Sequence, residues 1–344
     1  MPIRPIATFL RWTAFALMLG GLAACQSTDL PKDMAPLSRE VEQRIVAIGS
    51  TPASPIYVRL FKEESEFEVW KRRPDGTYAL MKTYAICTWS GQLGPKLAEG
   101  DRQAPEGFYI VGPGQMNPNS SYYLSFNIGF PNAYDAAWGR TGSHLMVHGA
   151  CSSAGCYSMT DEQMGEIYAL VREAFRGGQR TFQVAAFPFR MTPENMARHR
   201  DNSNMPFWEM LKEGYDHFEV TRRVPDVQVC DRRYVFNAEA RRGQEFDPLL
   251  PCPDYEVPEE IAVAVAAKQE ADAIRFEAEV ARLEAAESGG AVAATATEAA
   301  DQAAGSPPAD DPGVDETTTA SAFSEEGGQD GNFITRLFGG LFGD

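Results

Sequence analysis

A histidine and a cysteine stand eight positions apart in the segment SHLMVHGACSSAGCYSMT, which covers residues 143–160. His148 ends an apolar run typical of a strand, and Cys156 comes shortly before Thr160, a residue type that caps helices. An imidazole beside a thiol can take the thiol proton and later give it to a leaving amine, so this pair suits acyl transfer on amides. We expect the positive end of the following helix dipole to lower the pKa of Cys156.

Two glycines flank the pair. Gly149 and Gly155 lack a Cβ atom, so the chain can turn tightly there and backbone N–H groups can face a developing oxyanion. By spacing alone, however, a cysteine and a histidine in a strand and its loop are also compatible with a structural role. The pattern therefore leaves two interpretations, a catalytic pair or a structural one.

The surrounding residues predict a mainly β domain with a few helices. Apolar and polar residues alternate with a period of two before the segment, and stretches rich in glycine and proline separate the alternating runs. The predicted strands are residues 56–61, 67–72, 78–87, 108–111, 122–128, 145–147, 180–187 and 227–235. The predicted helices are residues 39–48, a helix between Thr160 and Gly177, one that opens at Thr192, and residues 207–212 and 259–287. Short strands at this spacing indicate a β-sandwich or barrel-like domain.

The segment also carries a family resemblance. His148-Gly149 and the block Ser153-Ala154-Gly155-Cys156-Tyr157-Ser158-Met159 resemble the two signature elements of the YkuD-type L,D-transpeptidase catalytic domain. Ala154 stands where that family has a histidine and Ser158 where it has an arginine, and both departures are typical of its YafK-like branch. Further agreeing stretches are residues 86–96, 100–102, 105–109, 127–135 and 188–192. The resemblance implies a mainly β YkuD fold that acts on peptidoglycan.

The resemblance also implies a covalent mechanism without a cofactor. Cys156 is the expected nucleophile and His148 the general base and acid; the backbone amides of Gly155 and Cys156 are the expected oxyanion donors, and Ser153 is expected to bond the imidazole or the substrate. The thiolate would attack the L-centre carbonyl of meso-diaminopimelate in a stem tetrapeptide, release D-alanine and form a thioester. An amine of another stem peptide or of a protein lysine would complete the transfer. Four histidines argue against a histidine-rich metal site.

Two alternative functions stay open at this point. The YafK-like branch includes an amidase that detaches covalently bound lipoprotein from diaminopimelate, which is the same thioester chemistry with water as the acceptor. Ala154, in place of the second family histidine, leaves the acceptor undecided. The other alternative is a non-catalytic lipoprotein that binds peptidoglycan. All three functions would serve cell wall biogenesis and cell shape.

Four further residues are candidates around the site. Arg102 or Arg140 could hold a stem-peptide carboxylate through paired hydrogen bonds, although solvation at the surface is the commoner fate of an arginine. Tyr134 either lines the expected cleft or anchors a buried loop. His144 is an alternative base to His148, or else a structural residue.

The first 25 residues predict export and a lipid anchor. Arg4 and Arg11 accompany the apolar run WTAFALMLGGL, whose 11 residues are too few to span a bilayer core that needs about 20. The run ends in Leu-Ala-Ala-Cys25, which resembles the lipobox of bacterial lipoproteins, and Gln26 by the same resemblance favours the outer membrane. Acylation of Cys25 would hold the chain on the membrane. We therefore expect a periplasmic protein anchored in the inner leaflet of the outer membrane.

Five cysteines remain after Cys25. Because five is odd, at least one thiol stays free in an oxidising compartment. Cys230 and Cys252, which are 22 residues apart, are a plausible disulfide pair. Cys87 could pair with Cys151, but no local pattern supports that bond, and Cys151 is equally compatible with a resolving thiol or a small buried hydrophobic residue.

The negative charge is concentrated at the end of the chain. The net charge is −17; residues 259–344 hold 18 acidic and 4 basic residues, a net of −14, which leaves −3 for residues 1–258. No basic face is available for nucleic acid. We expect a signal peptide (residues 1–24), a tether (25–53), the catalytic domain (54–235), a linker (236–258), an exposed helix (259–287) and a disordered acidic tail with an apolar end (288–344).

Overall fold

Two five-stranded sheets form the centre of the structure, a computed structural model that describes residues 30–153 and 155–304. In spatial order, the strands of the first sheet are β3 (Tyr78–Ala85), β2 (Glu66–Arg72), β1 (Ile56–Phe61), β10 (Phe182–Phe187) and β5 (Gly107–Val111). Those of the second sheet are β4 (Thr88–Trp89), β9 (Tyr157–Ser158), β8 (Met146–His148), β7 (Ser125–Asn127) and β6 (Met116–Asn117). The expected mainly β fold with a few helices is confirmed.

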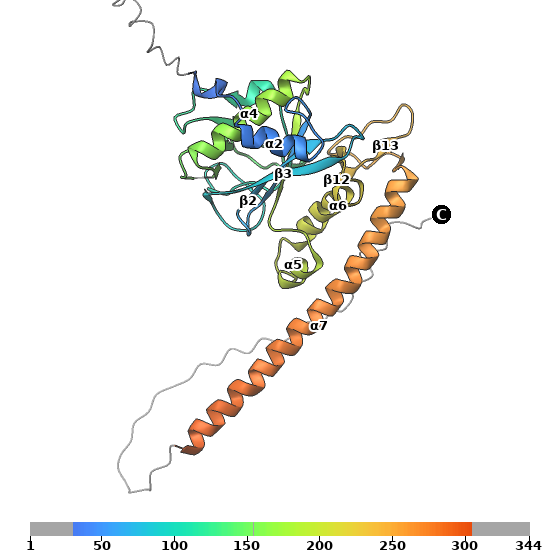
Figure 1. Ribbon diagram of the computed structural model, residues 1–344. Coiled ribbons are helices and arrows are strands. Elements are labelled where there is room, and N and C mark those ends of the chain that lie inside the picture. Colours follow the sequence, from blue (N-terminus) through green and yellow to red (C-terminus); the bar gives the residue numbers. More distant parts are fainter. Residues whose placement is uncertain (1–29, 154, 305–344) are drawn as a thin grey trace, which may run out of the picture. The chain divides into compact units, whose positions relative to one another are not determined.

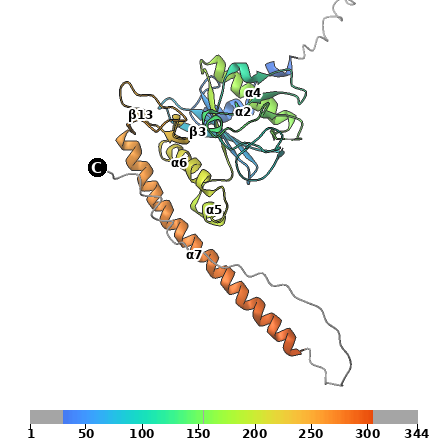
Figure 2. The same ribbon diagram turned by 180° about the vertical axis from the view of Figure 1, so that it is seen from behind.

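The first sheet is covered on both faces. Every residue of β1 is buried, because alternate side chains enter two different hydrophobic clusters. Val58 and Leu60 pack toward α4 (Asp161–Arg176) and the second sheet, whereas Tyr57 and Phe61 pack toward α6 (Met205–Thr221). Figure 1 shows α4 on one side of this sheet and α6 on the other, and Figure 2 shows the same layers from behind.

Helix α4 begins where its capping residues predict. The Thr160 hydroxyl accepts a hydrogen bond from the Gln163 N–H at 3.1 Å, and the Gln163 side chain accepts one from the Thr160 N–H at 3.1 Å. The apolar stripe of the helix, which includes Ile167 and Leu170, is fully buried in the cluster between the sheets. The helix start that follows Cys156 in the sequence is therefore firmly held.

The segment expected to be a tether is partly folded into the domain. It holds a 3-10 turn, η1 (Lys32–Met34), and α2 (Arg39–Ala47), an amphipathic helix capped by Ser38. Val41 and Ile45 on its apolar face are 2% and 0% exposed in the cluster beside α4. The expectation of a tether over residues 25–53 is therefore wrong for α2, because burial of an apolar helix face removes it from solvent.

Residues 227–236 form a hairpin where the sequence predicted one strand. β11 (Val227–Cys230) and β12 (Arg233–Phe236) are antiparallel, and the two residues between them, Asp231 and Arg232, have φ of 48° and 57°. This left-handed pair is the conformation of a tight hairpin turn, which the sequence does not mark with glycine. The expected disulfide between Cys230 and Cys252 is present, and a further short hairpin, β13 (Glu239–Ala240) with β14 (Tyr255–Glu256), follows.

The remaining elements are helical. They are η2 (Pro113–Gln115), α3 (Ala133–Ala137), α5 (Pro193–Arg198) and α7 (Glu259–Ala304). The α7 helix continues past Glu287, the end that its composition predicted. Its first half is attached to the domain: Asp272 is buried and accepts hydrogen bonds from Lys212 of α6 and from Lys268, each at 2.6 Å. No helix in the described ranges has the length and apolar character needed to cross a membrane. Cys25, the signal segment and the apolar end of the chain lie outside the described residues.

Candidate active site

His148 and Cys156 lie on one face of the second sheet. His148 ends β8 and Cys156 directly precedes β9, and these strands are parallel neighbours in which Val147 pairs with Tyr157 and His148 with Ser158. Val147 and Tyr157 both enter the buried cluster between the sheets. Because side chains alternate along a strand, His148 and Cys156 both point to the opposite face, as diagonal neighbours. The strand register thus places the two predicted residues on one face, and no hydrogen bond joins their side chains among the described residues.

A short crossover loop, residues 149–156, joins these two strands. Parallel neighbours usually need a connection of a dozen residues or more, because the chain must return along the full strand. Here eight residues make the return, and the backbone is left-handed at Ala150 (φ 67°), Cys151 (φ 46°) and Gly155 (φ 119°). The crossover loop is therefore tightly folded, and both ends of it belong to the site.

The His148 ring is held through one of its two nitrogens. Its Nδ1 donates a hydrogen bond to the Gly149 carbonyl oxygen at 2.6 Å, and because a carbonyl only accepts, Nδ1 carries the hydrogen and Nε2 the lone pair. The ring is 4% exposed and packs against Tyr122 with 4.8 Å between ring centres. Burial lowers the pKa of His148, and the Gly149 hydrogen bond opposes that shift. Burial thus favours the neutral form of the His148 ring.

Cys156 is the free cysteine among the described residues. Its Sγ accepts a hydrogen bond from the Met146 N–H at 3.4 Å and contacts the His144 carbonyl oxygen at 3.7 Å. Burial raises the pKa of Cys156, while the Met146 N–H and the charge of Lys96 act in the opposite direction. The expected lowering by a helix dipole is wrong, because β9 intervenes and α4 starts only at Asp161. The protonated thiol therefore needs a base.

Ser153 supports the backbone of Cys156. Its hydroxyl accepts from the Cys156 N–H at 2.9 Å, donates to the Cys156 carbonyl at 2.6 Å and contacts the Ser90 hydroxyl at 2.9 Å. Two expectations are corrected by these contacts: Ser153 bonds neither the imidazole nor an open substrate position, and the Cys156 amide is already engaged. Of the two amides expected to donate to the oxyanion, that of Gly155 remains the candidate.

Gly149 is required by close packing. A Cβ atom at this position would lie 2.5 Å from Oδ1 of Asp161 and 3.0 Å from the Tyr122 carbonyl oxygen. The Gly149 N–H also donates to that Tyr122 carbonyl, at 3.0 Å. Gly149 was expected to support the pair. It does so by letting the crossover loop pack closely against Asp161 and Tyr122.

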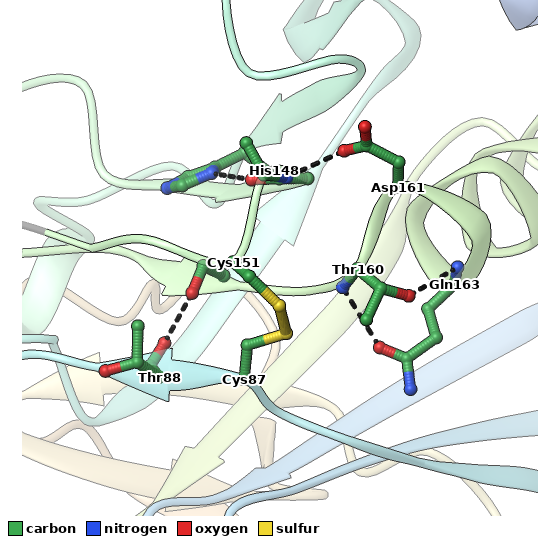
Figure 3. The surroundings of a disulfide bond; sticks show 10 residues. Cys87, Thr88, His148, Cys151, Thr160, Asp161 and Gln163 are labelled. Atoms are coloured by element: carbon green, nitrogen blue, oxygen red, sulfur yellow. Dashed lines mark hydrogen bonds between the residues drawn. A yellow bond between two sulfur atoms is a disulfide. The ribbon is translucent and has the colours of Figure 1, made fainter.

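A disulfide ties the crossover loop to the segment that joins the two sheets. Cys151 bonds Cys87, which lies between β3 and β4 and is 64 residues earlier in the chain. Figure 3 shows this bond beneath His148 and Asp161. Cys151 is exposed, so its interpretation as a small buried hydrophobic residue is wrong. The sequence carried no signal for this pair because its partners are far apart along the chain.

The three candidate substrate-binding residues lie in different surroundings. Arg102 is exposed, and its Cα is 3.8 Å from the position that a Cβ on Gly155 would take, so it stands beside the crossover loop. Arg140 instead pairs with Asp135 of α3 at 2.8 Å and lies over the ring of buried Tyr134, with 4.9 Å to the ring centre. Arg140 and Tyr134 thus have the contacts of a buried loop anchor, the alternative considered for Tyr134 from the sequence.

Sequence reasoning missed three neighbours of the pair. Asp161 accepts a hydrogen bond from the Ala150 N–H at 2.8 Å, the Tyr122 ring packs at a tilt against His148, and Lys96, which is almost fully buried, places its charge near Cys156. Only Asp161 had a sequence signal, its position directly after a helix cap, and that signal alone indicates a favourable helix end. No group of three potential metal ligands occurs within the described parts of the chain.

Fold and site together define a mainly β domain that presents a cysteine and a histidine for nucleophilic chemistry. Residues 55–217 match the family model of the L,D-transpeptidase catalytic domain, YkuD. The chain is 46% identical over 200 residues to the protein named "Putative L,D-transpeptidase YafK" of Escherichia coli (strain K12), and equally to the protein of that name from Escherichia coli O157:H7. Each alignment covers 58% of this chain and 78% of the relative. The chain therefore belongs to the YkuD L,D-transpeptidase family.

Two solved structures are also similar. The helical cell shape determining protein Pgp2 from Campylobacter jejuni aligns with a TM-score of 0.32 at 19% identity, covering 52% of this chain and 63% of that protein. Bd1075 from Bdellovibrio bacteriovorus aligns with a TM-score of 0.27 at 17% identity, covering 56% and 66%. This chain thus spans slightly less than two thirds of each of these structures.

Proposed function

We propose that this protein is a peptidoglycan L,D-transpeptidase that works through a thioester on Cys156. The observation that carries the proposal is the placement of Cys156 and His148 on one sheet face, with the Nδ1–H of His148 committed to Gly149 and Nε2 left as the base. Family membership supports the same chemistry. The raised pKa of the thiol and the lowered pKa of the imidazole call for proton transfer at the moment of attack.

The proposed first half-reaction acylates the enzyme. The Cys156 sulfur forms a bond to the carbonyl carbon at the L-centre of diaminopimelate, while the thiol proton moves to Nε2 of His148. The tetrahedral oxyanion collapses, the amide C–N bond breaks, and the imidazolium gives its proton to the departing D-alanine amine. We assign the carboxylate of that D-alanine to Arg102, and the nearness of its backbone to Gly155 supports this assignment.

The proposed second half-reaction releases the acyl group. An acceptor amine gives its proton to Nε2 of His148 and attacks the thioester, and the departing sulfur takes that proton back. Water in place of the amine gives hydrolysis, which is the amidase alternative, and the two acceptors yield different products from one intermediate. Export and a lipid anchor at Cys25 complete the proposal; two disulfides, Cys87–Cys151 and Cys230–Cys252, support an oxidising compartment such as the periplasm.

Covalent labelling tests the nucleophile. Purified protein is treated with a carbapenem, which acylates reactive thiols, and its mass is measured intact. We expect one adduct on the wild-type chain and none on Cys156→Ala. Among the described residues the two disulfides leave Cys156 as the free thiol, and loss of the adduct in Cys156→Ala assigns it to this sulfur. Absence of any adduct on the folded wild type would contradict the enzyme and favour a module that only binds peptidoglycan.

Product analysis identifies the acceptor. The protein is given tetrapeptide muropeptides and, separately, sacculi that carry covalently attached protein, and the products are followed by mass spectrometry. New cross-links between stem peptides support transpeptidation. Release of attached protein without new cross-links would overturn the transpeptidase assignment and establish hydrolysis.

A further inference from the structure

The peptide group between Gly149 and Ala150 is held at both of its polar atoms. Its carbonyl oxygen accepts the hydrogen bond from Nδ1 of His148 at 2.6 Å, and its N–H donates to Oδ1 of Asp161 at 2.8 Å. Figure 3 shows the two hydrogen bonds meeting from opposite sides, one from the His148 ring and one from the Asp161 carboxylate. No other side chain among the described residues bonds this peptide group.

We propose that Asp161 is the positioning residue of His148 and acts on it through this peptide group. The inference deepens the proposed function and rests on it. A peptide unit is planar, so a carboxylate that fixes the direction of its N–H also fixes its C=O, which points the other way. A charge-assisted hydrogen bond to the N–H further polarises the unit and makes the carbonyl a stronger acceptor. The Nδ1–H form of the ring is thereby favoured, and Nε2 stays basic.

The same arrangement supports the ring after it has taken the thiol proton. The imidazolium then holds a positive charge that the polarised carbonyl stabilises, with the Asp161 carboxylate behind it. In serine and cysteine enzymes with a direct carboxylate–histidine contact, the carboxylate has this task. Here one peptide group stands between the two, so Asp161 reaches His148 without touching it.

Asp161 is itself fixed by independent contacts. It is the first residue of α4, directly after the Thr160 cap, and the first turn of that helix is anchored by fully buried Met164. Gly149 leaves the space that the carboxylate occupies, since a Cβ atom there would stand 2.5 Å from Oδ1. The rigid helix thus transmits its position to the crossover loop.

Three variants separate positioning from folding. Asp161→Ala removes the acceptor and the charge, and the nearly isosteric Asp161→Asn keeps an acceptor and removes only the charge. Glu162→Gln is the matched control, because Glu162 is exposed in the same first turn and has no contact with the crossover loop among the described residues. The disulfide at Cys151 still holds the loop in all three variants.

The readout is the single-turnover rate at which a carbapenem acylates Cys156, measured between pH 5 and 9. We expect Asp161→Ala to lower this rate about tenfold, the effect of losing one hydrogen bond to a charged group. Asp161→Asn should fall between it and the wild type, and Glu162→Gln should match the wild type. Loss of the carboxylate disfavours the imidazolium, so the rising limb of the rate should move to lower pH. If the substitution only loosened the crossover loop, water would reach the His148 ring, and the rising limb of the acylation rate would move to higher pH instead.

Alkylation by iodoacetamide above the thiol pKa provides the folding control. There the sulfur is already ionised and needs no base, so all variants should react like the wild type. Wild-type acylation rates and an unmoved pH limb in both Asp161 variants would overturn the inference. An equal loss in acylation and in alkylation would also overturn it, since the loop would then have lost its fold. Failure of the wild type to be acylated would instead refute the proposed function.

Discussion

Two regions of this molecule each combine a buried histidine with a disulfide. In the crossover region, His148 lies beside the loop that Cys87–Cys151 holds; in the hairpin region, His217 of α6 lies beside the β11–β12 hairpin, from which Cys230 bonds Cys252. Both rings are 4% exposed, and burial lowers the pKa of both, that of His217 to about 4. Burial and a lowered pKa are therefore shared by the proposed base, His148, and by His217, and do not distinguish them.

The two regions differ in how the ring nitrogens are used. Nδ1 of His217 accepts a hydrogen bond from the Asn237 side-chain amide at 2.8 Å, and the ring packs against Phe236 with 5.8 Å between centres. Nδ1 of His148 donates to a carbonyl instead, so its basic nitrogen is the one left for the sheet face that carries Cys156. The two histidines thus differ in the hydrogen-bond partner of Nδ1 and not in how deeply the ring is buried.

Exchange of each histidine gives the largest expected contrast. His148→Gln should lower the acylation rate of Cys156 by about 100-fold or more, the usual contribution of a general base. His217→Gln should leave the rate unchanged and lower the free energy of unfolding by about 1–3 kcal/mol, because a buried hydrogen-bond partner is lost. Carbapenem acylation and urea unfolding measure the two quantities. Equal acylation rates in the two variants would contradict the different roles assigned to His148 and His217.

Removal of each disulfide gives the next contrast. By loop entropy, Cys87→Ser with Cys151→Ser should lower the free energy of unfolding by up to about 4 kcal/mol and Cys230→Ser with Cys252→Ser by up to about 3 kcal/mol, since the closed loops span 64 and 22 residues. Only the first pair should also slow acylation, because only it holds the crossover loop. A slowed rate after loss of Cys230–Cys252, measured where both variants are fully folded, would show that the hairpin region supports the site.

Acidification should weaken the hairpin region through His217. The ring is neutral in the folded state down to about pH 4, whereas the unfolded chain takes up a proton near pH 6.5. Stability from this group is therefore complete above pH 6.5 and is lost as the pH falls toward 4, by about 3 kcal/mol. The difference between the wild type and His217→Gln in urea unfolding across this range isolates the contribution, and a constant difference would contradict it.

Truncation from the end should have the smallest effect. Removal of residues 259–344 takes Lys268 away from Asp216, which is fully buried, and we expect a loss of about 1–3 kcal/mol in unfolding free energy. Removal of residues 305–344 should change nothing measurable in stability. Neither truncation should alter acylation of Cys156, because the ion pair of Lys212 with Asp272 joins α7 to α6, and no such contact between the described side chains of α7 and the crossover loop is present. Loss of acylation in the longer truncation would show that α7 supports the site.

Much of the fold follows from local patterns in the sequence. Strand β1 begins and ends where its alternation predicted, and α4 begins at its capping box. The motif around His148 and Cys156 was recognisable from its residue types and family resemblance, and the strand register places the two residues on one face. These features depend on residues that are near in sequence, so the sequence contains their signal.

Features that depend on distant residues could not be predicted. Helix α6 extends well beyond residues 207–212 and through Gly214, a poor helix former; a Cβ at Gly214 would lie 2.4 Å from the Phe236 ring, so packing against the hairpin decides this residue. The Cys87–Cys151 bond joins residues 64 apart. The pKa of Cys156 was misjudged because a helix that is near in sequence is separated from the thiol by a strand.

Because the crossover loop is short, the number of residues between β8 and β9 is constrained. A parallel return in eight residues has no slack, so a chain one residue shorter would have to draw β9 along β8 by one place. Such a slip turns every side chain of a strand to its other face, and the sulfur would then enter the hydrophobic interior while Tyr157 turned outward. Natural variation and protein engineering can therefore change side chains within this loop far more readily than its number of residues.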